Sequence, residues 1–260
     1  MKQFKAGVIQ FDVRKGQIQA NMDTLFNYLE RLAVVGVSLA VLPEMFSCSF
    51  DNENLSRHAK ETEAIIEQLS EFAKEKHMAL TGSLPVDKGK KIYNTMIFID
   101  MDGTVKKNYQ KLHLFRLTGE HHYYAAGDHI GIVDTGFGRV GLMICYDLRF
   151  PELARSLFLQ GAQMILVSAQ WPRPRENHWQ VLIKARAIEN QLFVIGSNRT
   201  GTDDSLVFPG MSMIVDPLGN MVANAGEKQG VDVAQINLDL VEKARGSIPC
   251  MTDRRTDIYG

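Results

Sequence analysis

The sequence predicts an α/β fold, because short apolar runs rich in β-branched residues alternate with longer segments of helical period. The clearest helical segment is 62–76, whose apolar side chains recur at the spacing of a helix packed on a sheet: Ile65, Leu69, Phe72 and Ala73. Turn signals at Asp102-Gly103 and at 217–220 separate neighbouring expected strands as in hairpins. Because no repeat or linker composition interrupts the chain, we expect residues 1–260 to form one domain.

The individual elements follow from the same patterns. The expected strands are the apolar runs Ala6–Phe11, Leu39–Leu42, Ala79–Leu84, Thr95–Ile99, Val140–Ile144, Met164–Ser168, Phe193–Ser197 and Met213–Asp216. The expected helices are the periodic segments Met22–Val34, Thr62–Lys76, Pro151–Leu159 and Arg175–Asn190. The polar segments Asp203-Asp204-Ser205 and 226–230 are expected to be surface loops.

Bulk composition narrows the class of partner. Of the 260 residues, 45% are hydrophobic, and 29 Lys and Arg residues balance 30 Asp and Glu residues to a formal charge of −1. A chain without basic excess is not expected to bind nucleic acid. No apolar run approaches the length of a membrane span, and the N-terminus leads into an expected strand instead of a signal peptide. We therefore expect a cytoplasmic protein without membrane contact.

The three cysteines, Cys48, Cys145 and Cys250, are too widely separated for a disulfide framework and form no zinc-binding pair. Cys145 directly follows the expected strand Val140–Ile144, and Pro151 suits the first turn of a following helix. A thiol at this junction is exposed at the carboxyl edge of a sheet, where backbone N–H groups can stabilise a developing negative charge. The alternative is a small buried hydrophobe, which describes most free cysteines.

Two charged residues also stand where extended segments end. Glu44 follows a buried strand and Pro43, and its apolar flanks predict a partly desolvated carboxylate, whose raised pKa suits a general base. The alternative for Glu44 is a helix cap or a surface ion pair. Lys111 stands where an extended run gives way to a loop rich in aromatic residues, and its ammonium can donate to an oxyanion. The alternative for Lys111 is a solvated surface charge.

Three separated motifs join these residues. They are Pro43-Glu44-Met45-Phe46, Tyr109-Gln110-Lys111-Leu112-His113-Leu114-Phe115 and Cys145-Tyr146-Asp147-Leu148-Arg149-Phe150-Pro151. With these motifs in this order, the chain resembles the nitrilase superfamily of carbon–nitrogen hydrolases over essentially its whole length. The resemblance identifies Glu44, Lys111 and Cys145 as the catalytic Glu, Lys and Cys of the family. It identifies Glu120 as the second glutamate that is frequent in the loop between Lys and Cys.

The resemblance also implies an architecture. The expected fold is a four-layer αββα sandwich that forms a homodimer through the helices following the nucleophile strand, and the tail 247–251 is a further candidate contact with the partner. No metal or organic cofactor is expected. The adjacent His121-His122 cannot converge on one ion, and no carboxylate–histidine set has the spacing of metal ligands.

Further segments resemble the bacterial omega-amidase branch, which acts on monoamides of small dicarboxylates such as 2-oxoglutaramate. They are 111–116, 120–121, 171–175, 178–180 and 185–191. Arg116 departs from the aspartate that many other branches carry, which weakens the transfer of their substrate preferences but leaves Glu44, Lys111 and Cys145 untouched. The resemblance implies hydrolysis of the terminal amide of a small dicarboxylate monoamide, such as 2-oxoglutaramate, through a cysteine thioester, with Trp171 in the substrate pocket.

The chemistry implied is attack of Cys145 on the amide carbon with Glu44 as general base. Lys111 and the backbone N–H of Tyr146 would hold the oxyanion, and Glu120 would orient Lys111 or the attacking water. Because a strand end contributes little to a core, Lys111→Ala is expected to lose most activity but to fold.

A substrate carboxylate needs a cation, and a guanidinium binds it in bidentate fashion. Arg173, Arg175 and Arg116 are candidates, of which Arg175 is preferred, although each could be a surface charge or a dimer contact. Arg186 and Glu189, three residues apart on an expected helix, are interpreted as a structural ion pair.

Other functions stay open at this point. The same three residues serve nitrilases, N-carbamoyl amine hydrolases and acyltransferases, and a non-catalytic scaffold could keep the fold. A Cys–His protease would need His113 or His178 beside Cys145, and the Glu–Lys context already supplies a base. The sequence does not identify the physiological substrate.

Overall fold

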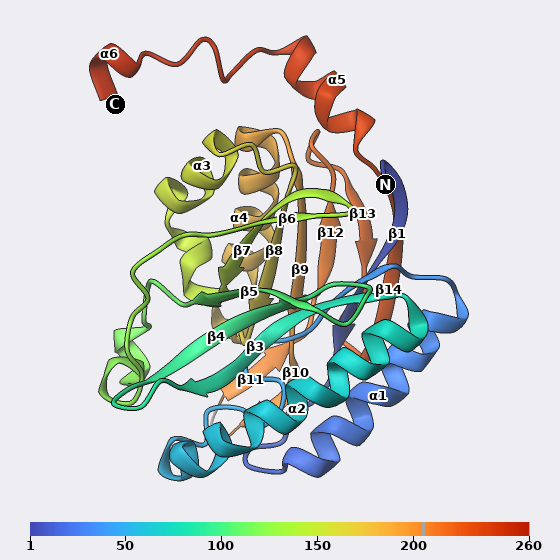
Figure 1. Cartoon of the computed structure of the whole chain (residues 1–260). Coiled ribbons are helices and arrows are strands. Elements are labelled where there is room, and N and C mark those ends of the chain that lie inside the picture. Colours follow the sequence, from blue (N-terminus) through green and yellow to red (C-terminus); the bar gives the residue numbers. More distant parts are fainter. Residues whose placement is uncertain (204–205, 260) are drawn as a thin grey trace.

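Two mixed six-stranded sheets lie face to face in the computed structural model, which describes residues 1–203 and 206–259 (Figure 1). Helices cover the outer face of each sheet, so the layers run helix, sheet, sheet, helix. This arrangement confirms the expected four-layer αββα sandwich. Of the loop expected at Asp203-Asp204-Ser205, Asp203 ends a strand, and the other two residues lie outside the described residues.

Each sheet combines parallel central strands with antiparallel edges. In spatial order, the first sheet contains β14 (Gly230–Asn237), β1 (Gln3–Gln10), β2 (Leu39–Val41), β3 (Ala79–Asp87), β4 (Ile92–Ile99) and β5 (Val105–Gln110). The second contains β13 (Met221–Asn224), β12 (Met213–Val215), β9 (Phe193–Asn198), β8 (Met164–Ala169), β7 (Gly138–Ile144) and β6 (Gly131–Thr135). A separate hairpin contains β10 (Thr200–Asp203) and β11 (Leu206–Pro209).

The helices form the two outer layers. The first sheet is covered by α1 (Ile18–Val34) and α2 (Leu55–Lys76), and the second by α3 (Pro151–Leu159) and α4 (Glu176–Asn190) (Figure 1). After β14 come α5 (Asp239–Ser247) and α6 (Thr256–Tyr259), and the segment between them runs away from the sheets (Figure 1). Within the described residues, no helix has the length and apolar character that crossing a membrane requires.

Both faces of the central strands are buried. Along β7, Val140, Leu142 and Ile144 pack against the first sheet, whereas Met143 packs under α3 and α4. Side chains alternate between the two faces of a strand, so a strand covered on both sides must be apolar at every position. This explains why the central strands read as continuous apolar runs in the sequence.

All eight expected strands and all four expected helices are present; α3 has the expected bounds, and each of the others differs at one end or both. The largest shift is at α2, which begins seven residues before Thr62 because Leu55, His58 and Ala59 also face the core. The sequence patterns did not predict the edge strands β5, β6, β13 and β14, the hairpin β10–β11, or the C-terminal helices. Edge strands are half-exposed and carry polar residues, as in the Lys106-Lys107 pair of β5, so their sequence signal is weak.

Strand direction determines where the functional residues gather. In the first sheet β2 and β3 are parallel, and β4 is antiparallel to both β3 and β5, so β5 runs in the same direction as β2. In the second sheet β7, β8 and β9 are parallel. The ends of the two sheets also meet, since Ser168 Oγ donates to the carbonyl of Leu42 at 2.7 Å. The residues that follow β2, β5, β7 and β8 are thereby brought to one edge of the sandwich.

Candidate active site

Cys145 lies at the sharp end of β7. It begins a short 3₁₀ turn, Cys145–Arg149, and has a φ of +43°, a value that non-glycine residues rarely adopt. Strained backbone of this kind clusters at functional sites, where the surrounding structure enforces it. We name residues 144–150 the Cys145 turn. Its geometry presents the sulfur at the carboxyl edge of the second sheet.

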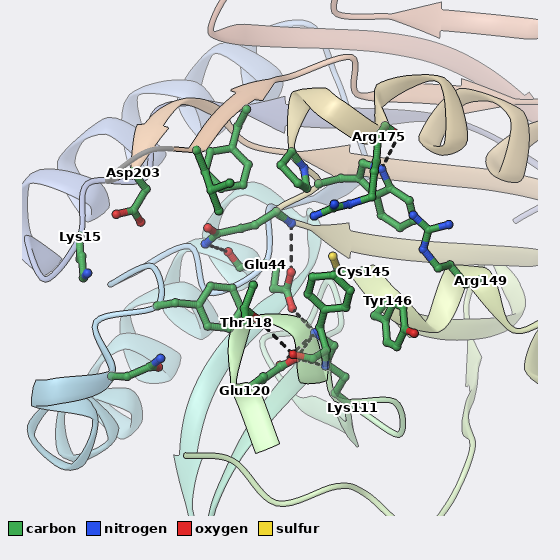
Figure 2. Close-up of a pocket in the computed structure, with 18 residues that line it drawn as sticks. Lys15, Glu44, Lys111, Thr118, Glu120, Cys145, Tyr146, Arg149, Arg175 and Asp203 are labelled. Carbon is green, nitrogen blue, oxygen red and sulfur yellow. Dashed lines mark hydrogen bonds and ion pairs between the residues drawn. The ribbon is translucent and has the colours of Figure 1, made fainter. Parts of the chain in front are cut away.

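Glu44, Lys111 and Glu120 form a buried ion cluster beside Cys145 (Figure 2). Lys111 Nζ lies 2.8 Å from Glu44 Oε1 and 2.9 Å from each carboxylate oxygen of Glu120. None of the three residues is more than 3% exposed. Phe115 also donates its backbone N–H to Glu120 Oε2 at 2.6 Å, which ties the loop after Lys111 to this carboxylate. One ammonium thus bridges two carboxylates away from water.

Two amide side chains that the sequence did not reveal hold Glu44. Asn94 Nδ2 donates to Glu44 Oε1 at 2.8 Å, and the backbone N–H of Gln170 donates to Glu44 Oε2 at 3.0 Å. Gln170 Nε2 also donates to the backbone carbonyl of Glu44 at 2.8 Å. Gln170 directly follows β8. The signal that indicated Glu44, a polar residue at the end of a buried strand, could therefore have indicated Gln170 as well. Asn94 lies inside β4, where the sequence shows only the polar pair Asn94-Thr95 in an otherwise apolar run.

Burial sets the protonation states of the cluster. Burial raises the pKa of Glu44 above its usual value of 4.5, although the charge of Lys111 opposes this shift. For Lys111, burial alone lowers the pKa, but the charges of Glu120 and Glu44 outweigh it and hold the pKa well above 10.5. Burial and the charge of Glu44 raise the pKa of the Cys145 thiol well above 9.0. At neutral pH the thiol therefore keeps its proton.

The protonated thiol has a base beside it. Glu44 and Cys145 line the same cavity, and a hydrogen bond with the thiol limits the rise of the Glu44 pKa that burial causes. A hydrogen bond from the backbone N–H of Gln170 likewise limits the rise of the thiol pKa, which burial and the charge of Glu44 cause. This arrangement can transfer the thiol proton to Glu44 when an electrophile is attacked, with Lys111 as a fixed cation nearby.

A cavity of about 320 Å³ opens above these residues (Figure 2). Glu44, Lys111, Glu120 and Cys145 all line it. Other lining residues include Tyr146, Trp171 and Arg175, which sequence reasoning had assigned to the substrate. The cavity is within the size range of small-molecule sites.

The cavity is polar at both sides (Figure 2). Arg149 and Arg175 line one side, and Lys15 and Asp203 line the other. The guanidinium of Arg149 stacks on Trp171 at 4.6 Å, and that of Arg175 lies 5.4 Å from the Phe115 ring. In the described part of the chain, neither arginine is ion-paired with a carboxylate. Arg149 lies in the Cys145 motif, but its position in the cavity was not foreseen.

The other sequence candidates lie elsewhere. Arg173 pairs with Glu227 at 2.6 Å outside the cavity, and Arg116 is exposed and does not line it. Arg186 and Glu189 form the expected ion pair at 2.9 Å. Cys48 is buried, and burial raises the pKa of its thiol to about 12.

Among residues 1–203 and 206–259, no three His, Cys, Asp or Glu side chains are grouped so that they could hold a metal ion. The rings of His121 and His122 pack against each other at 3.9 Å. Neither histidine lines the cavity beside Cys145.

The structure corrects the expectation that Lys111→Ala leaves folding intact. The Lys111 side chain is 2% exposed, and its removal would leave two buried carboxylates without a cation. Breaking a buried ion pair by removing one partner costs about 3–5 kcal/mol. Lys111 therefore has a structural role in addition to the catalytic role that is expected of it.

We predict that Lys111→Ala lowers the free energy of unfolding by about 3–5 kcal/mol in urea titrations at pH 8. The loss should be smaller at pH 5. Without Lys111 the folded-state pKa of Glu44 rises further above 4.5, and a raised carboxyl pKa gives stability that disappears as the pH increases. Lys106→Ala, an exposed position on β5, should change stability by less than about 0.5 kcal/mol. Equal stability of the two variants would contradict the prediction.

Known proteins share both the fold and the sequence pattern. The family model described as carbon–nitrogen hydrolase matches residues 5–246. A 2-oxoglutaramate amidase of Bacillus subtilis (strain 168) is 37% identical over 96% of this chain and 97% of its own. A Staphylococcus aureus protein described as a hydrolase in the agr operon is 33% identical over 98% of this chain and 99% of its own. The crystal structure of a carbon–nitrogen hydrolase from Helicobacter pylori G27 matches with a TM-score of 0.94 and 27% identity, covering 99% of this chain and 97% of that one. The chain therefore belongs to the carbon–nitrogen hydrolases of the nitrilase superfamily.

Proposed function

We propose that the protein is an amidase that hydrolyses the terminal amide of a small dicarboxylate monoamide, such as 2-oxoglutaramate, to acid and ammonia. The observation that carries the proposal is that Glu44, Lys111 and Cys145 line one cavity, which is also lined by Arg149 and Arg175, two guanidiniums without a carboxylate partner among the described residues. The name of the Bacillus subtilis relative supports the choice of substrate.

Acylation uses Glu44 as the base. As Cys145 Sγ bonds to the amide carbon, Glu44 takes the thiol proton, and the carbonyl electrons move to oxygen. Lys111 Nζ and the backbone N–H of Tyr146 hold this oxyanion. One such donor typically lowers the activation free energy by about 3–4 kcal/mol. The intermediate then collapses, Glu44 returns the proton to nitrogen, and the C–N bond breaks. Ammonia departs, and the acyl group remains on Cys145 as a thioester.

Deacylation repeats the proton transfers with water. Glu44 takes a proton from a water molecule as the water oxygen attacks the thioester carbon, and the C–S bond breaks. The departing sulfur recovers the proton from Glu44, which restores the starting state. Glu120 bridges to Lys111 with both carboxylate oxygens and thereby fixes the ammonium at the oxyanion position. Asn94 and Gln170 fix Glu44 in the same way.

The two arginines supply recognition of the far carboxylate. Arg149 and Arg175 line the same side of the cavity, and the pKa of Arg149 is lowered from its usual value of 12.5 by burial and, to a lesser extent, by the charge of Arg175. A bound carboxylate would relieve this repulsion and accept hydrogen bonds from the guanidiniums. An amide without a distal negative charge gains nothing from the pair.

We predict that the purified protein releases ammonia from 2-oxoglutaramate and succinamate. Cys145→Ala should abolish the reaction, and Glu44→Gln should slow it by about 10²–10⁴-fold because the general base is lost. Cys250→Ala, at a partly exposed thiol outside the cavity, should match the parent. Turnover of nitriles or N-carbamoyl amines alone would move the assignment to another branch, and no turnover of any of these would favour a non-catalytic scaffold.

We predict that Arg175→Gln lowers kcat/KM for 2-oxoglutaramate by about 10- to 100-fold, the value of a charge-assisted hydrogen bond to the substrate. The rate with butyramide, which has no carboxylate, should stay within a factor of about two. Arg149→Gln should show the same selectivity. The matched control is Arg173→Gln, whose arginine pairs with Glu227 outside the cavity. An equal loss with both amides would contradict a role in carboxylate recognition.

We also propose that two copies of the chain associate through the outer face of α4. Val181 and Ile188 on this helix are 54% and 53% exposed, and the tail after α5 runs away from the sheets with Ile248 63% exposed (Figure 1). Burying such apolar positions in a dimer would remove them from water.

Light scattering should therefore give twice the chain mass for the parent protein. The double variant Val181→Glu/Ile188→Glu should give the mass of one chain, because buried carboxylates would be left without partners. Val222→Glu, at a similarly exposed position on β13, should stay dimeric. A monomeric parent protein would rule the proposal out.

A further inference from the structure

A buried carboxylate outside the ion cluster connects two parts of the site. Asp147 lies two residues after Cys145, is 0% exposed and does not line the cavity. It therefore cannot touch a substrate held there. Its two oxygens nevertheless accept four hydrogen bonds, about the full accepting capacity of a carboxylate.

The four donors come from the two segments that carry Cys145 and Lys111. Asp147 Oδ2 accepts from the backbone N–H of Ile144 at 3.0 Å, directly before Cys145, and from Tyr109 Oη at 2.7 Å. Asp147 Oδ1 accepts from His113, at 3.0 Å from the backbone N–H and 2.8 Å from Nδ1. Tyr109 and His113 stand two residues before and two residues after Lys111.

We propose that Asp147 is a positioning residue that sets the separation of the Cys145 sulfur from the Lys111 ammonium. The inference rests on the proposed roles of Cys145 and Lys111. One carboxylate links the second sheet, through the Cys145 turn, to the first sheet, through residues 109–113. We name this arrangement the Asp147 brace.

Two features make the Asp147 brace rigid. Tyr109 is fully buried, and burial together with the charge of Asp147 raises the pKa of its hydroxyl well above 10.0, so it stays a donor. The ring of His113 stacks on Phe150, the last residue of the Cys145 turn, with centroids 3.6 Å apart and planes 8° apart. The same two segments are thus joined by hydrogen bonds and by ring packing.

The Asp147 brace fixes the geometry of the Cys145 turn. Cys145 keeps a φ of +43° only because its neighbours are fixed, and the bond from Ile144 to Asp147 fixes the residue before it. Without the Asp147 brace, the Cys145 turn and residues 109–113 would relax independently. A displacement of about 1 Å between reacting groups can cost about 100-fold in rate.

The test is Asp147→Asn, in which one acceptor oxygen becomes a donor of nearly the same shape. We expect kcat for 2-oxoglutaramate to fall about 100-fold while KM stays within about threefold, since no substrate contact is removed. Iodoacetamide should alkylate Cys145 more slowly by a similar factor, with the partly exposed Cys250 as an internal control in mass spectrometry. The alkylation rate does not depend on the substrate assignment, so failure of the proposed amidase activity and failure of the Asp147 brace are distinguishable.

The matched control is Asp216→Asn. Asp216 is also buried and accepts backbone N–H bonds, from Leu218 and Asn220, but in the turn between β12 and β13. A purely structural role for Asp147 would leave kcat and the alkylation rate of Asp147→Asn equal to those of this control, which would overturn the proposal.

A milder variant decides the question if Asp147→Asn does not fold. Tyr109→Phe removes one donor and keeps the buried ring. We expect its kcat to fall about tenfold at constant KM, the effect of losing one hydrogen bond. Parental kcat in Tyr109→Phe would overturn the proposal. If both variants fold, their effects on kcat should be non-additive, because both act through one carboxylate.

Discussion

The site depends on one ammonium held between two carboxylates where water is excluded. Lys111 satisfies Glu44 and Glu120 at 2.8–2.9 Å, and no member of the cluster is more than 3% exposed. Ions buried in this way are costly unless each is paired. The pairing keeps Lys111 charged, and burial leaves Glu44 a stronger base than an exposed glutamate. Stability and chemical competence therefore come from the same contacts.

The fold makes this cluster possible through strand direction. Glu44 and Lys111 follow strands of the first sheet, and Cys145 follows a strand of the second, all with their carboxyl ends at one edge. The base and the cation thus approach the sulfur from the opposite sheet. Because the sheets pack rigidly through apolar side chains, the separation of these groups is fixed by the core and by the Asp147 brace between its two layers.

The sequence predicted the central elements well, because strands buried on both faces are continuous apolar runs. It also indicated Glu44, Lys111 and Cys145, since each stands where an extended segment ends. Other residues could not be found in this way. Asn94 lies within a strand, and Arg149 has a position in the cavity that depends on how the Cys145 turn is folded. The burial of Lys111 was missed because it results from contacts with Glu44, 67 residues away, and with Glu120, which the fold of the following loop brings back to Lys111.

The central claim is that Glu44, Lys111 and Cys145 act together on one carbonyl carbon. The most direct measurement is the mass of the Cys145 peptide after 2-oxoglutaramate is mixed with the protein and quenched in acid within milliseconds. We expect an added acyl group on Cys145 that forms before the carboxylic acid product appears and is absent from Glu44→Gln. Ammonia release at the parental rate with no acyl group on Cys145 would contradict it.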